Sequence, residues 1–524
     1  MWSGAPRPRA GARVWIIAGA MLLAMPLAAR ASAQVLTTSL REDLTTTDPS
    51  AYLGLTGSRL LGLVYEGLSA VTPEGRIMPA LATRWEVFEQ GRLWRFHLRP
   101  GVRFHSGRPL TVADVQRSVE AVLASRSPGI GVLALSKLEG ARAFTDGRAE
   151  RLAGFTPLDA LSFELRFTEP VGTFAHHPLL IFDSGAEREG GAGWFAHQSG
   201  GTGPFRLDGW TRGREVTLSA NPDHWGGAPP VTGLRFRLLP DVETALRLFD
   251  TGTLDFVSVP ESALRRVLAD PVYRERAVAT PRAQVRYLGL NQSLYPPFRD
   301  RRVRAAIAHA LDRAAVAQGL YGGAAHAAAG LVSPGVGGHT DGVLDRPYRP
   351  DEARRLLAEA GYPEGRGLPP VELTAPESAR DEAAYYADQL RRVLGLPVRV
   401  RTLERAAFGS AANAATLGMF LSGWTADYPD ALTYLEPMWH SRSPYNQSCW
   451  RDETVDRWID EAVGTVDDAA RHRLSQAIEQ RLLEEAAAVP LPVPMNVLLR
   501  HASAAAVAVD PFGFLSVGPR RRGP

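Results

Sequence analysis

The sequence predicts an α/β protein built from two lobes, with an additional small α/β subdomain and strands that connect the lobes. Two observations lead to this fold class. Segments with a hydrophobic residue at every second position alternate with segments in which hydrophobic residues recur at helical spacing, for example over residues 234–260. The chain has 524 residues and is 45% hydrophobic, so it is long enough for more than one core.

The first 33 residues have the layout of a secretory signal peptide. Three arginines precede an apolar run over residues 14–29, and Ala31 and Ala33 form a small-residue cleavage site. The apolar run is short for a membrane span, so an uncleaved anchor is the less favoured alternative. No cysteine stands at the cleavage point. We therefore expect a free periplasmic protein, cleaved after Ala33, and not a lipoprotein.

Charge and cysteine content argue against two classes of function. The signal segment carries four arginines and no acid, so its removal turns a formal net charge of +3 into a slightly negative one. No basic face with interleaved aromatic residues appears, which makes nucleic acid an unsuitable partner. Cys449 is the single cysteine in the chain, so neither an internal disulfide nor a cysteine-cluster metal site is expected.

The N-terminal part of the chain is predicted to form mainly strands. Residues 35–42 predict an opening strand, and residues 161–167 predict a later one with alternating apolar positions. Residues 94–98 alternate in the same way, and the Pro-Gly pair at residues 100–101 is expected to turn the chain back. Hydrophobic residues then alternate again over residues 102–104, which predicts a hairpin across that turn.

A helix is predicted after this hairpin, and the α/β pattern then continues to the C-terminus. Thr111 and Asp114 have the spacing of a capping box, and hydrophobic residues follow at helical spacing. Further strands are predicted at residues 215–219, 234–239, 256–260, 287–292, 371–374, 398–402, 419–422 and 497–499. Further helices are predicted at residues 243–255, 301–313, 351–360, 381–393, 455–462 and 469–488. We expect the chain to cross between the lobes near residue 288 and to return at residues 490–494.

Several motifs of this chain resemble one protein family. They are VYEGL, PALATRWE and WRFHLRPGVRFHSGRPLTVADV within residues 64–115, GTGPF at residues 201–205, and NPDHWGG at residues 221–227. Together they closely resemble the family 5 extracytoplasmic solute-binding proteins, which are the oligopeptide, dipeptide and nickel receptors of ABC importers. The resemblance implies a periplasmic-binding-protein-like fold of the class II type. It also implies a binding protein and not an enzyme.

The resemblance also suggests how the chain divides into domains. The small subdomain is expected to interrupt lobe I, and the C-terminal segment is expected to return to it. The expected segments are residues 1–33 for the signal peptide, 34–60 for the first part of lobe I, 61–190 for the small subdomain, 191–287 for the second part of lobe I, 288–489 for lobe II, and 490–524 for the return to lobe I and the tail.

The strongest candidate binding residues lie in LSGWTADYPDALTYLEPMWHS, at residues 421–441. In the family that the chain resembles, a Trp-x-x-Asp sequence at the corresponding position lines the cleft. In peptide-binding members, the Asp of this sequence pairs with the ligand's ammonium group. The resemblance assigns this role to Asp427, an apolar wall to Trp424, and backbone contacts to Thr425. A charged amine that leaves water needs such a partner. The alternatives are that Asp427 caps the following turn and that Trp424 is only core.

Other candidate contacts are less specific. The resemblance places Leu53, Gly54 and Leu55 where the receptor backbone meets the ligand, by the kind of pairing known as β-augmentation. A surface loop after the first strand is the alternative. A ligand carboxylate would need a cation, and four arginines near predicted strand ends are candidates between which the sequence does not choose: Arg282, Arg286, Arg401 and Arg405.

The function predicted from these observations is the capture of oligopeptides, dipeptides or similar small solutes by lobe closure. The expected partners are the ligand and a membrane ABC permease, and the protein is expected to be a monomer without a cofactor or metal. A receptor for nickel chelate, haem or an opine is the alternative within the family. A secreted peptide hydrolase is the alternative of another class, although the sequence has no G-x-S-x-G and no H-E-x-x-H motif.

Overall fold

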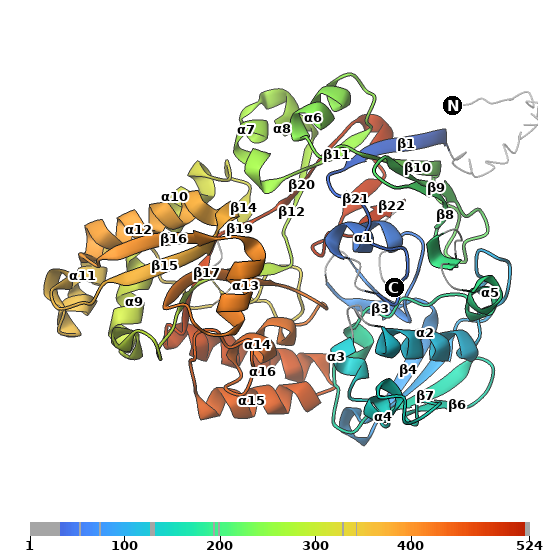
Figure 1. Ribbon diagram of the computed structural model, residues 1–524, viewed down its shortest axis with the longest axis horizontal. Helices are drawn as coiled ribbons and strands as arrows, with labels where there is room; N and C mark the ends of the chain where they lie inside the picture. The colour runs from blue at the N-terminus through green and yellow to red at the C-terminus, as the bar shows by residue number, and fades with distance from the viewer. Residues whose placement is uncertain are drawn as a thin grey trace, which may run out of the picture.

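A computed structural model describes residues 32–51, 54–72, 75–125, 132–191, 194–196, 200–326, 330–341 and 343–518. Most of the predicted signal peptide, residues 1–31, lies outside this range. The described chain forms two α/β lobes, with lobe I and the small subdomain on the right of Figure 1 and lobe II on the left. A three-stranded sheet connects the lobes.

Lobe I is built on a four-stranded sheet of order β1-β10-β9-β8. β1 pairs in parallel with β10, and the other neighbours are antiparallel. Its core also contains residues from helix α1 and from the C-terminal hairpin of β21 and β22. These elements are β1 (Ser32–Leu40), α1 (Gly54–Leu61), β8 (Phe205–Thr211), β9 (Glu215–Ala220), β10 (Val231–Leu238), β21 (Val507–Val509) and β22 (Leu515–Val517).

The small subdomain contains a second four-stranded sheet, of order β4-β5-β7-β6. Its strands and helices are β2 (Ser69–Val71), β3 (Ile77–Pro79), β4 (Ala82–Phe88), β5 (Leu93–Leu98), α2 (Val112–Ala124), α3 (Val132–Leu135), α4 (Ala141–Thr145), β6 (Phe155–Pro157), β7 (Ser162–Arg166) and α5 (Ser184–Gly190). β5 pairs with β4 and β7. The predicted hairpin partner at residues 102–104 is therefore wrong. Val102 and Phe104 alternate because their side chains are buried in the subdomain core, and not because they pair with β5.

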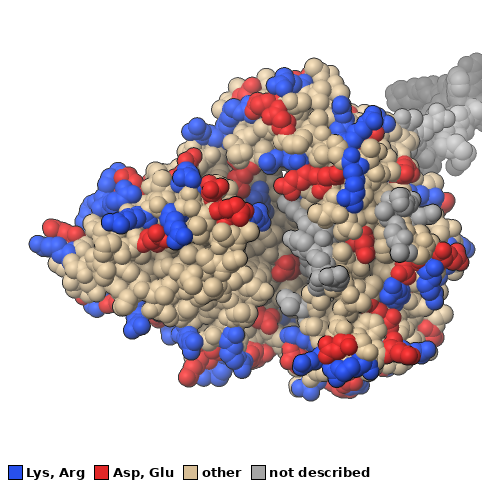
Figure 2. All heavy atoms as spheres, viewed as in Figure 1, with Lys and Arg blue, Asp and Glu red and all other residues tan. Residues whose placement is uncertain are grey.

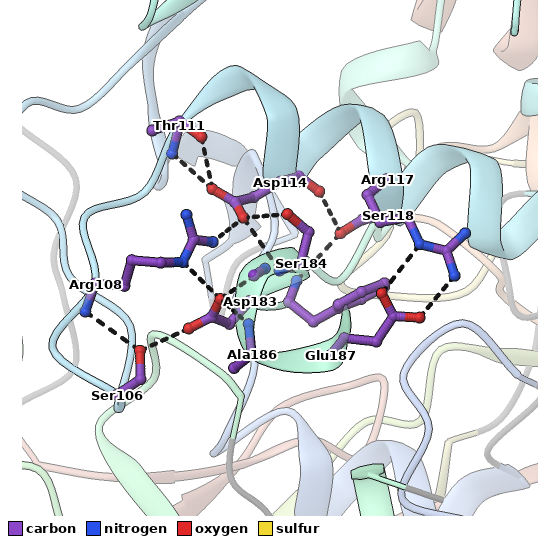
Figure 3. Close-up of polar contacts among 12 residues, drawn as sticks. Ser106, Arg108, Thr111, Asp114, Arg117, Ser118, Asp183, Ser184, Ala186 and Glu187 are labelled. Atoms are coloured by element: carbon purple, nitrogen blue, oxygen red, sulfur yellow. Dashed lines mark hydrogen bonds and ion pairs between the residues drawn. The ribbon is translucent and has the colours of Figure 1, made fainter. Parts of the chain in front are cut away.

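Two helix N-termini of the subdomain share a network of buried polar groups (Figure 3). The predicted capping box of Thr111 and Asp114 is present at the start of α2. The Asp114 carboxylate also accepts hydrogen bonds from the backbone N–H of Ser184 (3.1 Å) and from its hydroxyl (2.7 Å). Arg108 forms ion pairs with both Asp114 and Asp183, the N-cap of α5. The network thereby fixes α5 against α2.

Lobe II is built on a five-stranded mixed sheet of order β16-β15-β17-β13-β18. Its strands are β13 (Gln284–Leu290), β15 (Val371–Pro376), β16 (Val398–Leu403), β17 (Met419–Thr425) and β18 (Ala488–Leu491). Its helices are α9 (Arg301–Ala310), α10 (Arg313–Gly319), α11 (Pro350–Glu359), α12 (Arg380–Leu394), α13 (Arg405–Asn413), α14 (Leu432–Trp439), α15 (Glu453–Gly464) and α16 (Asp468–Glu484). The helix predicted through residue 488 ends at Glu484, because the chain turns at Ala486, where φ is positive, and residues 488–491 then pair with β13.

The sheet that connects the lobes has the order β11-β20-β12 and is called the hinge sheet below. Its strands are β11 (Phe256–Val259), β12 (Ala277–Thr280) and β20 (Asn496–Arg500), accompanied by α6 (Val242–Asp250), α7 (Leu264–Ala269) and α8 (Pro271–Arg276). Alternate residues of β11 and β20 face different cores. Phe256 and Leu498 pack in the core of lobe I, whereas Val257, Val259 and Leu499 pack in the core of lobe II.

The chain crosses between the lobes twice. It leaves the hinge sheet after β12 and enters the lobe II sheet at Gln284, before the boundary predicted after residue 287. It returns through the short strand β19 (Val493–Pro494), which pairs with β14 (Ala325–His326). Because α6 and α7 share a core with lobe II, the predicted lobe I segment 191–287 contains residues that pack in both cores.

Candidate ligand-binding site

Figure 2 shows a furrow between the lobes. The lobes are joined at the hinge sheet, and the subdomain backbone at Gly75 also lies close to Gly335 of lobe II. In addition, a subdomain segment around residues 172–177 contacts lobe II. The backbone N–H of Gly172 donates to the Val463 carbonyl (2.9 Å), and the rings of His177 and Tyr428 lie 4.2 Å apart between centroids. The candidate binding residues lie at the end of β17 in lobe II.

Trp424, Thr425 and Asp427 are positioned by the pairing of β17 with β13. Gln284 is opposite Thr425, the last residue of β17, whose side chain is exposed. One more hydrogen bond follows beyond this pair, from the Ala426 N–H to the Ala283 carbonyl (2.9 Å). The chain then turns, and the Asp427 N–H donates to the Thr433 hydroxyl (2.9 Å). The three predicted residues are therefore brought together on one fixed strand end.

Asp427 is a half-buried carboxylate without a cation. Burial raises its pKa above the ordinary value, and the indole of Trp424 has a smaller, opposite effect. No described arginine, lysine or histidine forms an ion pair with it. A half-buried carboxylate in this state would gain from an incoming ammonium group.

Asp430, three residues later, is satisfied by the protein itself. Arg471 donates to its carboxylate (Nε–Oδ2 2.8 Å), and His472 lies 3.3 Å from the same oxygen. Burial opposes its ionisation, yet these two neighbours hold its pKa well below the ordinary value. Its other oxygen accepts the N–H of Leu432 (3.0 Å) at the start of α14. Asp430 is therefore satisfied both by cations and by the backbone at the start of α14.

An aromatic pair stands beside Asp427. The rings of Trp424 and Tyr445 lie 5.3 Å apart in an edge-to-face arrangement, and Tyr445 is 39% exposed. Trp424 also packs against the core of lobe II, so the wall and core interpretations both describe part of its surface. Tyr445 was not predicted, because nothing in its local sequence pattern marks it. Gln447 holds its segment against β17 by accepting a hydrogen bond from Ser422 (3.0 Å).

The other predicted contacts have different surroundings. Leu53 lies outside the described residues. Gly54 and Leu55 begin α1, so their backbone is in the first turn of a helix, where N–H groups have no intrahelical acceptor. Their predicted contact with the ligand stays a prediction.

Three of the four candidate arginines form ion pairs with carboxylates of the protein, and the fourth has no ion pair with a described residue. Arg286 forms a buried ion pair with Glu382 (2.5 Å) and donates to the Tyr321 hydroxyl (2.7 Å), so it belongs to the lobe II core. Arg401 pairs with Glu372 (3.3 Å) on the surface. Arg282 pairs with Glu261 (3.4 Å) near the lobe crossing. The fourth candidate, Arg405, is exposed at the start of α13.

Three of the motifs that carry the family resemblance meet where lobe I joins the small subdomain. Glu66, from VYEGL, accepts hydrogen bonds from the Thr202 hydroxyl (2.9 Å) of GTGPF and from the Trp225 indole (2.7 Å) of NPDHWGG. The His224 ring also lies 3.1 Å from the Glu66 carboxylate. These landmarks therefore contribute to the packing of the fold.

The described residues include neither a membrane-spanning helix nor a cluster of metal ligands. No helix among residues 32–518, apart from the gaps given above, is long and apolar enough to cross a bilayer. The described histidines, cysteine and acids form no group of three that could hold a metal ion.

Comparison with known proteins identifies the family. The model for bacterial extracellular solute-binding proteins, family 5 Middle, matches residues 76–446. The probable deoxycholate-binding periplasmic protein YgiS of Escherichia coli K12 is 27% identical over 464 residues, which cover 85% of each chain. The glutathione-binding protein GsiB of Escherichia coli K12 is 25% identical over 498 residues, or 93% of this chain and 94% of its own.

Solved structures show the same fold. HbpA2 from Haemophilus parasuis superposes with a TM-score of 0.80 at 22% identity, over 93% of this chain and all of the other. The predicted two-lobed α/β fold and the predicted family are thereby confirmed. YgiS and GsiB bear the names of binding proteins. The chain belongs to the family 5 bacterial extracellular solute-binding proteins of ABC importers.

Proposed function

We propose that this protein captures short peptides in the periplasm by closing its lobes around them, and delivers them as a monomer to the membrane permease of an ABC importer. Export removes the signal segment after Ala33. The uncompensated charge of Asp427 and the two-lobed fold support the proposal. One relative is named for binding glutathione, which is a tripeptide.

The contrast between Asp427 and Asp430 carries this proposal. Both carboxylates belong to one turn, but the protein supplies a cation only to Asp430. An ammonium group would supply the missing partner of Asp427. The exposed strand end at Thr425 offers backbone groups to an extended ligand, and the Trp424–Tyr445 pair offers apolar contact that tolerates different side chains. These three features together fit the N-terminal end of a peptide.

Closure follows from the two-lobed construction. A ligand that contacts both lobes binds the closed form better than the open form, and this difference in affinity shifts the population toward closure. The hinge sheet connects the lobes and packs on both cores, so we expect the angle between the lobes to change at this sheet.

The proposal is tested by calorimetry with alanine peptides of two to five residues, each with a free and with an acetylated amine. Wild-type protein should bind the free amines at least tenfold more tightly. Asp427→Asn should lose this preference, a change of about 1.4 kcal/mol or more. The matched control is Asp388→Asn on α12, whose carboxylate forms surface ion pairs with Arg391 (3.9 Å) and Arg392 (2.8 Å).

Three results would contradict the proposal. Equal affinity for free and acetylated peptides, kept in Asp427→Asn, rejects Asp427 as the amine partner. Tight binding of deoxycholate or haem without peptide binding assigns the site to another ligand. Cleavage of the peptides during incubation, followed by mass spectrometry, supports the hydrolase alternative.

A further inference from the structure

The turn at residues 427–430, which carries Asp427, also takes part in the contact between lobe II and the small subdomain. Tyr428 is buried, and its ring lies against the His177 ring of the subdomain. Asp430, at the end of the turn, is fully buried and pairs with Arg471 of α16. The candidate ligand site and the subdomain contact therefore share one turn.

Arg471 extends this connection into the subdomain. Its side chain is fully buried, and its Nη2 lies 3.4 Å from Nε2 of His176, in the 3₁₀ turn Phe174–His176. Its remaining donors are used within lobe II, by Asp430 (2.8 Å), Asp468, and the carbonyls of Thr465 (2.9 Å) and Val466 (3.1 Å). A polar link from Asp430 through Arg471 to His176 thus crosses from lobe II to the subdomain.

The charge of His176 decides whether this link forms. A guanidinium has donors only, so Nε2 of His176 must accept and must be without a proton. The proton of the neutral ring is then on Nδ1, which is buried with no hydrogen-bond partner among the described residues. A protonated ring would have one N–H facing the Arg471 cation and a second N–H unpaired. The link therefore requires a neutral His176.

The groups around His176 favour the neutral ring. The charged and titratable ones are Asp430 of the turn, Arg471, Asp468 and His472 of α16, and the neighbouring His177. Burial lowers the pKa of His176; the two carboxylates oppose this shift, and the cationic neighbours add to it. Asp430 is already engaged by Arg471 (2.8 Å) and lies 3.3 Å from His472. Asp468, at 3.7 Å, is beyond hydrogen-bond distance of His176.

We propose that His176 and the turn at residues 427–430 form a latch between the subdomain and lobe II, and that protonation of His176 releases it. When the two parts separate, water reaches the imidazole, which then binds a proton as an ordinary histidine does. The joined arrangement therefore becomes less favourable as the pH falls below 6.5. Because Asp427 lies in the same turn, release should also weaken ligand binding, a consequence that rests on the proposed function.

Double electron–electron resonance on the ligand-free protein tests the latch. Nitroxide labels are attached at two exposed positions, Glu150→Cys of the subdomain and Glu461→Cys of α15, in a Cys449→Ser background. At pH 5.5 an imidazole with an ordinary pKa of 6.5 is protonated about ten to one. Between pH 7.5 and pH 5.5 His176 should therefore raise the ratio of separated to joined molecules about tenfold.

Two substitutions at His176 separate its charge from its hydrogen bond. His176→Gln keeps an acceptor for Arg471 but binds no proton, so it should remove the tenfold part of the response. His176→Lys carries a charge at both pH values and should be separated at both. His176→Asn is a second neutral acceptor if His176→Gln does not fold, and thermal unfolding shows which variants are folded.

His97→Gln on β5 is the matched control. His97 belongs to the same subdomain, but its ion pair is with Glu86 (3.4 Å) of the neighbouring strand. This variant should keep the full pH response of the wild-type protein, to which His177 contributes in every variant. Distances that do not change with pH, or a response that is equal in the wild-type protein and His176→Gln, would overturn the latch.

Calorimetry with the alanine peptides distinguishes the latch from the proposed function. Between pH 7.5 and pH 5.5, peptide affinity should fall about tenfold more in the wild-type protein than in His176→Gln. If the distances respond to pH but no peptide binds, the proposed function fails and the latch stands. If peptides bind but neither the distances nor the affinities depend on His176, the latch alone is rejected.

Discussion

His177 is held without charge where the subdomain meets lobe II. Burial, and then the charge of His176, lower its pKa to about 3 from an ordinary value of 6.5. Below pH 6.5 the His177 imidazole binds a proton in the unfolded chain but not in the folded protein. The free energy of unfolding therefore decreases as the pH falls from 6.5 toward 3. The loss attributable to this residue is about 1.4 kcal/mol per pH unit.

His177→Phe should therefore flatten the pH dependence of stability. Between pH 7.5 and pH 5.0 the wild-type protein should lose about 2 kcal/mol more than the variant, in urea unfolding followed by fluorescence. Phenylalanine keeps a ring against Tyr428, so the comparison isolates the proton. Other acids and histidines contribute to both proteins and cancel. Parallel pH profiles would show that His177 titrates normally in the folded state.

At the scale of elements, Asp114 is the group that connects α2 and α5 (Figure 3). It is fully buried, and it accepts from the Thr111 N–H and hydroxyl, from Ser184 and from Arg108. Asp114→Ala removes the acceptor but leaves the donors and the Arg108 charge. We expect a loss of about 3–5 kcal/mol, measured by calorimetric unfolding. Glu150→Ala, at an exposed acid of the same subdomain, should change little; equal effects would refute a structural role for the network.

This network also shows how far local sequence predicts structure. The capping box was predictable because Thr111 and Asp114 are three residues apart. The contacts to Asp183 and Ser184 come from a distant segment, and no local periodicity records them. The hairpin at residues 102–104 was wrongly predicted for a related reason. An alternating pattern indicates which side chains are buried, but not which strand lies alongside.

The same distinction applies to the site and the whole molecule. The common location of Trp424, Thr425 and Asp427 was predictable because they form one short motif on one strand end, and their contact with a ligand stays a prediction. Tyr445 was not predictable, since tertiary packing alone brings its segment beside Trp424. The sequence therefore indicated the strand end, whereas its aromatic neighbour required the tertiary structure.

The contact at Gly172 should favour the closed arrangement of the lobes. A Cβ at this position would lie 2.4 Å from the Thr465 carbonyl, so Gly172→Ala must push the subdomain away from lobe II. If the contact contributes about 1.4 kcal/mol to closure, peptide affinity falls about tenfold. Small-angle scattering of the ligand-free variant should show a larger radius of gyration. Gly409→Ala, where an added Cβ meets nothing within 4 Å, should leave both measurements unchanged. An unaltered radius and affinity in Gly172→Ala would mean that closure is governed by the hinge sheet and the ligand alone.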